Sequence, residues 1–347
     1  MTLILFILML GVIVLIHEAG HFFWAKKCGV YCYEFSIGFG PKLFSFHRKN
    51  DETTYSFRLI PIGGYVSMAG EEADDDKSIK NKQKLCNKPW YQKLIIVLAG
   101  VINNFILAFV VLFLIGLIYG SYETKPIVGT IVKGSASSKS ELRVGDQILR
   151  LNGKKTKTWD DLTLALNLEN NNKTQEFLVK GKDGKERIVN IKPDKNKDKD
   201  GNVTYSYGFG MNSKKKHGFV NALKYSTSKF GSMFSSMFVT IKALVTGKVG
   251  MNALSGPVGI YNIVGESRKA GFDNVLYLLA YLSVNIGFIN LIPFPAFDGY
   301  RAFITVIEAV SGKKVNQKVD AIVNNVGLLL LFGLMIYITV KDILRFF

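Results

Sequence analysis

Four long apolar runs alternate with segments that collect most of the charged residues of the chain. A helix needs about 20 residues, at about 1.5 Å each, to cross a hydrocarbon core of about 30 Å. The first run, Thr2–Ile16, is shorter than that, so its helix must continue through residues 17–24 if it crosses a membrane. We therefore expect four transmembrane helices, at residues 1–25, 94–119, 272–299 and 322–346.

Two apolar segments have alternative interpretations. The first run could be the apolar part of a signal peptide, but no basic residue precedes it and no small-x-small cleavage site follows it. Between Phe230 and Val245 the apolar residues recur at helical spacing, and Ser, Thr and Lys242 occupy the other side. This pattern predicts an amphipathic surface helix within the connector 213–271, not a fifth span.

A segment of mixed helix and strand, residues 122–212, lies between the second span and this connector. The pattern predicts two strands, a helix and a hairpin, at Pro126–Val132, Ile148–Leu151, Trp159–Leu166 and Phe177–Ile191. Asn152-Gly153 is a strong signal for a tight turn. The stretch Leu142–Gly153 resembles a bacterial PDZ domain, which implies capture of an extended peptide beside a strand. A generic β-rich domain is the alternative.

The chain carries 44 Lys and Arg against 27 Asp and Glu, a formal net charge of +17. Such a charge could indicate nucleic-acid binding, but basic loops also orient membrane proteins and attract anionic headgroups. Segments 26–93 and 300–321 are both basic, so we expect them in the cytoplasm, with both termini and the 122–212 domain outside. The lipid bilayer is then a partner, and nucleic acid is not. The three Cys are too few for a disulfide framework.

The first predicted span contains His17-Glu18-Ala19-Gly20-His21, an H-E-x-x-H pattern. Residues four apart share one helical face, so both imidazoles can reach one ion, and Glu18 can address a water beside it. Zinc suits such ligands. Charged groups inside an apolar helix are costly, at roughly 2.5 to 3.5 kcal/mol each at mid-bilayer. Packing against polar groups of neighbouring helices is the alternative explanation.

A catalytic zinc site generally has three protein ligands, and the third is not local to this helix. Cys28, Cys32, His47 and His217 are weaker candidates, because the cysteines follow the helix end and the histidines lie in polar loops. Asp298 is the better candidate, since Pro293 and Pro295 break the third span just before it. Irregular backbone at membrane depth is tolerated where it lines a cavity. The expected topology also brings all three side chains to the inner side of the membrane.

These residues resemble the site-2 protease family of intramembrane zinc metalloproteases, in particular the bacterial regulator-of-sigma-E-protease type with a single PDZ domain. His17–His21 and the Asn-x-x-Pro-x-Pro-x-x-Asp-Gly segment at Asn290–Gly299 match the two family motifs in order. Ala99–Phe105 is similar to a third family segment, with Val101 where the family has Pro. Ser255–Ile260 resembles a further segment, to which we assign no role.

The resemblance implies a fold and a set of site residues. The fold is a polytopic α-helical membrane protein with four transmembrane helices, a membrane-associated β-hairpin near Thr54–Met68 and one inserted PDZ-like domain of mixed α/β structure. We expect one Zn²⁺ per chain. His17, His21 and Asp298 are then its ligands, and Glu18 is the general base. Gly63-Gly64 reads as the hairpin turn. The substrate-binding residues are then Asn290, Pro293, Gly63, Gly64 and Asn104.

The function implied is hydrolysis of a peptide bond within the transmembrane helix of a single-pass membrane protein that another protease has already cut. Anti-sigma factors and remnant signal peptides are substrates of that class, and the bacterial cell membrane is the expected location. The alternatives are a membrane-anchored PDZ scaffold without catalysis, and a transporter, because broken helices and intramembrane polar residues also mark ion paths. Neither alternative predicts stoichiometric zinc.

Overall fold

The computed structural model describes residues 1–71, 76–169, 171–197, 203–250 and 254–346. The chain folds into two compact units. The first, which we call the helical unit, comprises Met1–Val111 and Leu254–Phe347. The second, the inserted unit, is Leu112–Ala253. Each unit is described by itself below.

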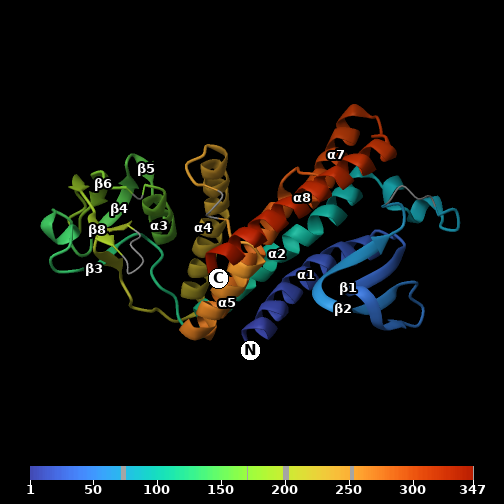
Figure 1. Ribbon diagram of the computed structural model, residues 1–347, viewed down its shortest axis with the longest axis horizontal. Helices are drawn as coiled ribbons and strands as arrows, with labels where there is room; N and C mark the ends of the chain where they lie inside the picture. The colour runs from blue at the N-terminus through green and yellow to red at the C-terminus, as the bar shows by residue number, and fades with distance from the viewer. Residues whose placement is uncertain (72–75, 170, 198–202, 251–253, 347) are drawn as a thin grey trace. The chain divides into compact units, whose positions relative to one another are not determined.

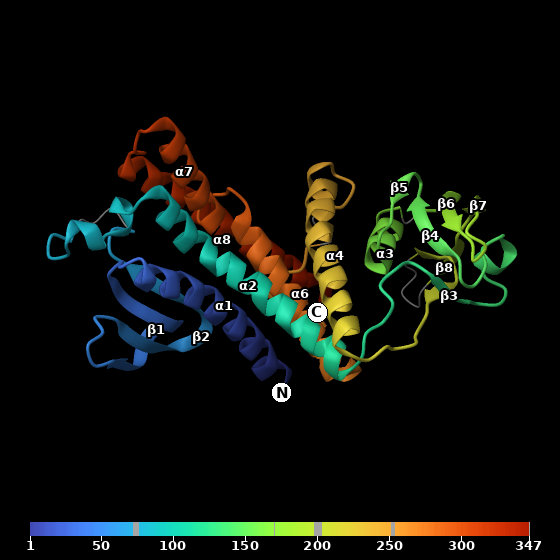
Figure 2. The same cartoon turned by 180° about the vertical axis from the view of Figure 1, so that it is seen from behind.

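Among the described residues, the α-helices of the helical unit can be followed in Figures 1 and 2. They are α1 (Thr2–Lys27), α2 (Trp90–Ile118, which continues into the inserted unit), α5 (Pro257–Ala270), α6 (Phe272–Leu291), α7 (Asp298–Ser311) and α8 (Gln317–Phe346). Helices α1, α2, α6 and α8 are long and apolar enough to cross a membrane. Helices suited to the four expected spans are therefore present, and the first continues without a break through His17 and His21.

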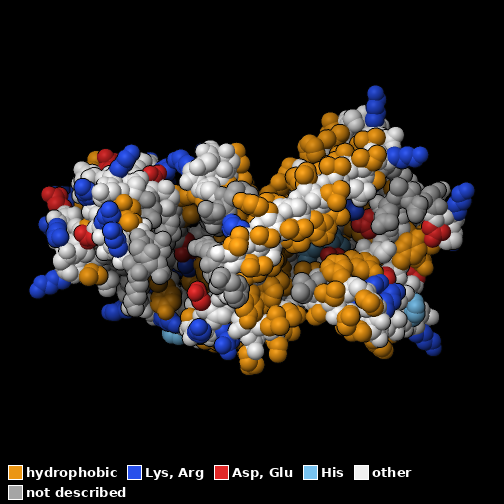
Figure 3. Space-filling view, in the orientation of Figure 1, with side chains coloured by type: hydrophobic (Ala, Val, Ile, Leu, Met, Phe, Trp, Pro, Cys, Tyr) orange, Lys and Arg blue, Asp and Glu red, His pale blue; other side chains and the backbone are white. Residues whose placement is uncertain are grey.

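Apolar packing joins α1, α5 and α6. Ile13 of α1 and Val264 of α5 are fully buried, and Val275 of α6 belongs to the same cluster. By contrast, α8 buries only 6% of its most apolar window, and Figure 3 shows hydrophobic side chains along its surface. A face of this kind needs lipid or another apolar partner to cover it.

Two long antiparallel strands, β1 (Cys32–His47) and β2 (Thr54–Met68), lie beside α1 (Figure 1). The connection between them is residues 48–53, so the prediction of a turn at Gly63-Gly64 was wrong. Both glycines lie inside β2, and Gly64 pairs with Ile37. Gly63 has a φ of 106°, and a side chain there would collide with the Phe39 ring. These glycines serve a bend and a close approach of strands, which local turn preferences cannot distinguish from a turn.

The third span ends earlier than predicted. Helix α6 stops at Leu291, an irregular segment carries Pro293 and Pro295, and α7 begins at Asp298. The prolines lack an N–H and so end the helix, as expected. The interpretation of 300–321 as a loop was wrong, because α7 occupies residues 298–311. Asn324 of α8 accepts a hydrogen bond from the backbone N–H of Ala296 (3.0 Å), which ties the irregular segment to the fourth span.

The segment Ser255–Ile260 leads into α5, and the far end of α8 binds it. The buried Asp342 carboxylate accepts hydrogen bonds from the backbone N–H groups of Gly256 (2.7 Å) and Gly259 (2.9 Å). Lys341 donates to the carbonyl of Leu254 (2.7 Å). An acidic group at a helix N-terminus satisfies donors that have no partner within the helix. This segment therefore joins α5 to α8.

The inserted unit has its own apolar core, in which Phe177, Ile148 and Leu162 are fully buried. Its elements are β3 (Val128–Ile131), β4 (Gln147–Leu151), β5 (Lys154–Lys155), α3 (Trp159–Leu168), β6 (Gln175–Lys180), β7 (Glu186–Ile191), β8 (Asp194–Lys197), β9 (Val203–Ser206), β10 (Phe209–Met211) and α4 (Phe219–Val245). A four-stranded sheet has the order β5-β4-β6-β7, and β3 pairs with β10. The predicted strands, helix and hairpin are confirmed, and positive φ at Asn152 and Gly153 matches the expected tight turn.

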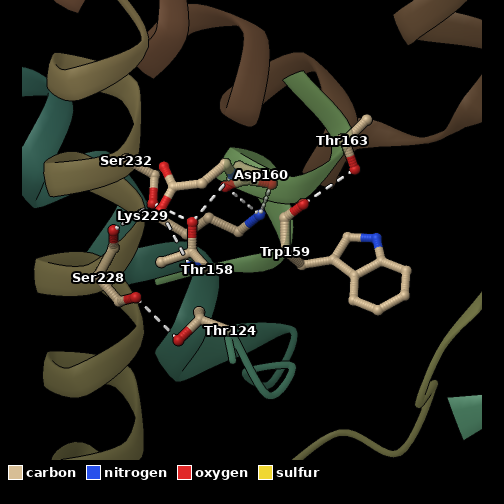
Figure 4. Close-up of polar contacts among 9 residues, drawn as sticks. Thr124, Thr158, Trp159, Asp160, Thr163, Ser228, Lys229 and Ser232 are labelled. Atoms are coloured by element: carbon tan, nitrogen blue, oxygen red, sulfur yellow. Dashed lines mark hydrogen bonds and ion pairs between the residues drawn. The ribbon is translucent and has the colours of Figure 1, made fainter. Parts of the chain in front are cut away.

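A row of polar contacts joins α3 to α4, and we call it the α3–α4 seam (Figure 4). Lys229 donates to both carboxylate oxygens of Asp160 (2.7 and 2.8 Å). The Ser232 hydroxyl donates to that of Thr158 (2.7 Å). Thr158 and Asp161 also form a capping box at the start of α3. The predicted amphipathic helix is thus present, begins eleven residues earlier at Phe219, and uses part of its polar side for packing.

Candidate metal centre

Three side chains from two distant parts of the chain meet in the helical unit. His17 and His21 lie one turn apart on α1, and Asp298 is the first residue of α7. Asp298 Oδ2 is 3.1 Å from His17 Nε2 and 3.3 Å from His21 Nε2. The two Nε2 atoms are 3.2 Å apart. The structure thus brings together the three residues predicted as ligands.

Glycines on α1 and α2 let the two helices pack closely and leave room for the two imidazole rings. A side chain at Gly20 would lie 2.5 Å from the carbonyl oxygen of Ala99, so only glycine allows this approach. A side chain at Gly100 would collide with the Nε2 of His21 and lie 2.8 Å from Cε1 of His17. Small residues at helix crossings let backbones approach closely. Gly100 therefore leaves the space that the imidazoles occupy.

The Nδ1 atom of each histidine, on the side of the ring away from Asp298, contacts a polar group of α2. His21 Nδ1 donates to the backbone carbonyl of Ile96 (2.8 Å), which leaves the lone pair of its Nε2 directed at Asp298. The amide of Asn104 is 3.4 Å from His17 Nδ1. A metal-binding histidine commonly uses its second nitrogen in this way, which fixes the ring orientation.

The three donor atoms fit a zinc ion. Ligands at about 2.0–2.1 Å on the corners of a tetrahedron lie about 3.3 Å from each other. The three separations of 3.1, 3.2 and 3.3 Å agree with this value. Asp298 Oδ2 is buried, and within the described residues no donor makes an aligned hydrogen bond to it. A buried carboxylate oxygen without such a bond is costly, and a cation between the three atoms would satisfy it.

A cavity of about 430 Å³ opens beside this cluster. His17, His21, Asp298 and Glu18 line it together with Asn290 and residues of β2. Histidine and acidic side chains are visible in a hollow of this unit in Figure 3. Glu18 is therefore positioned to act on a water or substrate atom that enters the cavity next to the three donors.

The remaining predicted site residues divide into two groups. Asn290 lines the cavity. Gly64 does not; a Cβ there would lie 2.6 Å from the backbone oxygen of Ser36, so its missing side chain allows the close approach of β1, and Glu18 Cγ would be at an ordinary contact distance of 3.6 Å. Gly63, Pro293 and Asn104 are likewise absent from the described lining. Asn104 is fully buried behind His17. Substrate binding by these five residues stays a prediction.

Two further residues of the cavity escaped the sequence reasoning. Arg301 of α7 pairs with Glu71, which follows β2, and both line the cavity. One signal was present in the sequence, since Arg301 lies one helical turn after Asp298, where a long side chain can reach the same face. Its partner could not be found by spacing, because the pair is 230 residues apart.

A protein-family model described as peptidase family M50 matches residues 5–334. The chain belongs to this family. Peptidase family M50 is the site-2 protease family, so the resemblance in the sequence is confirmed. As a member of this family the protein is a metalloprotease with zinc as its cofactor, as the sequence predicted.

Three relatives match over the whole of this M50 protease. FN1322 of Fusobacterium nucleatum is 37% identical, and the match covers 100% of each chain. The regulator of sigma-W protease RasP of Bacillus subtilis is 31% identical, covering 100% of this chain and 99% of the relative. The zinc metalloprotease RasP of Bacillus licheniformis is 30% identical with the same coverage. Together with the four apolar helices, these matches identify a bacterial membrane protein.

Proposed function

We propose that this M50 protease hydrolyses a peptide bond within the transmembrane helix of another membrane protein. The observation that carries the proposal is the set of three donors at tetrahedral separations, placed on the wall of a cavity among span-forming helices. A protease built for soluble substrates has no need to put its ligands inside an apolar helix, where polar groups are costly.

His17, His21 and Asp298 hold the zinc ion in this proposal, and Glu18 is the general base. Zinc supplies Lewis acidity at this point when it is bound. Glu18 accepts a proton from the attacking water and then donates it to the amide nitrogen as the C–N bond breaks, so the carboxylate is regenerated. Its place beside the three donors supports this role.

A transmembrane helix must unwind before it is cut, because its amide groups are bound within the helix and surrounded by lipid. Tyr65 and Val66 of β2 line the cavity, so an unwound segment could pair with an edge of the β1–β2 sheet while its scissile bond reaches Glu18. The amide of Asn290 is available to bind the same segment. Pro293 and Gly63-Gly64 would act by shaping the walls of this path.

The topology is part of the proposal. The basic segments 26–93 and 300–321 favour a cytoplasmic position, which puts both termini and the 122–212 domain outside the cell. We propose that this domain is PDZ-like and excludes substrates with bulky external parts, so that a first cut by another protease makes a substrate acceptable. Single-pass proteins such as anti-sigma factors or remnant signal peptides have the required form.

The test is Glu18→Gln in purified protein reconstituted with a single-pass reporter whose external part has been trimmed. Cleavage should fall by about 100-fold or more, the usual scale for loss of a general base, while bound zinc is unchanged. Glu266→Gln, at an exposed position on α5, is the matched control and should cleave normally. Retained cleavage in Glu18→Gln refutes the base assignment. Cleavage by the wild type only outside the reporter span refutes the intramembrane reaction.

A further inference from the structure

Asn104 holds one of the least exposed side chains of the helical unit, and nothing in the reaction above uses it directly. It is fully buried on α2, and its amide lies 3.4 Å from His17 Nδ1. In the described orientation the NH₂ end faces the ring, and the amide oxygen Oδ1 is buried without a hydrogen-bond donor among the described residues. An unsatisfied buried oxygen is unfavourable.

The orientation of this amide is coupled to the protonation of His17. An NH₂ group facing Nδ1 requires a lone pair there, so the ring proton must lie on Nε2, the atom that faces Asp298. A ring that binds a metal through Nε2 carries its proton on Nδ1 instead and must donate it. A half-turn of the Asn104 carboxamide exchanges its two ends and presents Oδ1 to that proton. The same half-turn gives Oδ1 a hydrogen-bond donor.

Helix α6 keeps Asn104 in place for this role. The hydroxyl of Ser283, itself fully buried, donates to the backbone carbonyl of Asn104 (2.8 Å). A side chain at Gly287 would lie 3.3 Å from the Cβ of Asn104, so α6 packs directly on it. The amide therefore has a fixed pivot next to His17, and rotation of its end is the freedom that remains.

We propose that Asn104 is a positioning residue, whose amide oxygen accepts the Nδ1 proton of His17 and so presents His17 Nε2 to the zinc ion. His21 has the equivalent arrangement with the Ile96 carbonyl. Each histidine ligand is then oriented by one acceptor on α2, a side chain for His17 and the backbone for His21. This role differs from the substrate contact that the family resemblance implies for Asn104.

The positioning role of Asn104 rests on the proposed function. Zinc binding by the wild type tests the metal site, and the change in zinc affinity in the Asn104 variants tests the positioning role. Affinity is measured by competition with a chromophoric chelator, and the visible absorption spectrum of cobalt-substituted protein reports the ligand geometry. Asn104→Leu has nearly the same shape but accepts no proton, so zinc should bind about 10- to 100-fold more weakly, the usual cost of losing such a partner. Asn104→Asp keeps an acceptor and should bind zinc within about threefold of wild type or more tightly.

Asn103→Leu is the matched control. Asn103 is the neighbouring residue and donates to the Ile16 carbonyl of α1 (3.1 Å), so it joins the same two helices through a backbone oxygen and not through a histidine. Its zinc affinity should stay within about threefold of wild type. Equal affinity in Asn104→Leu and wild type, or equal loss in Asn103→Leu and Asn104→Leu, overturns the proposal.

Asn104→Asp decides the matter even if the leucine variant does not fold, because a tenfold loss in the aspartate variant would also overturn it. A wild type that binds no zinc refutes the proposed function itself, whatever the variants do. Failure of the positioning role and failure of the metal site therefore give different results.

Discussion

The helical unit and the inserted unit each contain a cluster of polar side chains between helices, and the two clusters differ in how their atoms are paired. In the α3–α4 seam every contact joins a donor to an acceptor, as between Lys229 and Asp160 or Ser232 and Thr158 (Figure 4). In the metal centre, one potential ligand atom each from His17, His21 and Asp298 converges, at separations of 3.1–3.3 Å. Among the described residues, no donor makes an aligned hydrogen bond to Asp298 Oδ2.

This difference separates a structural contact from a binding site. Paired polar groups stabilise the helices that carry them and need nothing further. Three potential metal ligands that converge at tetrahedral separations are informative about a cation, because a cation can bind all three at once. Polar residues within a helix do not by themselves distinguish the two cases, because both clusters contain an aspartate in the first turn of a helix.

The largest expected effect contrasts these two aspartates. Asp298→Ala removes one of three ligands, so zinc affinity should fall by more than about 100-fold and proteolysis should be lost. This loss exceeds the usual effect of removing a residue that only orients a metal ligand. Asp160→Ala should leave bound zinc unchanged, because its carboxylate is bound by Lys229. Elemental analysis of the purified variants measures both. Full zinc in Asp298→Ala would remove it from the ligand set.

A second contrast concerns space rather than charge. Gly100→Ala puts a methyl group against the rings of His17 and His21, so zinc should bind at least about tenfold more weakly although alanine favours a helix over glycine. Gly333→Ala on α8 is the control, since no atom lies within 4 Å of the added carbon. Chelator competition gives the affinities. Equal zinc binding in both variants would mean that the rings do not need this space.

The smallest effect belongs to the seam. Thr158→Ala removes the capping box of α3 and a partner of Ser232, so the inserted unit should lose about 1 kcal/mol of stability. Thr163→Ala loses only a bond to the Trp159 carbonyl within the same helix and should change stability by less than about 0.5 kcal/mol. Thermal unfolding with zinc analysis tests both. A loss of zinc in Thr158→Ala would contradict the separation of the two clusters.

Local patterns predicted a large part of this structure. The four spans follow from apolar length, and the start of α3 follows from the acidic first turn formed by Asp160 and Asp161. Asp298 could be proposed because two prolines before it break a span. The predictions that failed, at Gly63-Gly64 and at α7, concern segments whose local signals suit a turn or a loop. There, the ring of Phe39, 24 positions away, occupies the space that a side chain at Gly63 would need.

By itself, the sequence determined which segments are apolar enough to span a membrane, and that His17 and His21 share one helical face. Both follow from the fixed geometry of a helix. Only the tertiary structure decided that Asp298 comes within 3.1 Å of His17, that Gly100 leaves room for the rings, and that Asn104 lies behind one of them. These contacts join residues more than 70 positions apart, and their distances depend on how whole helices pack.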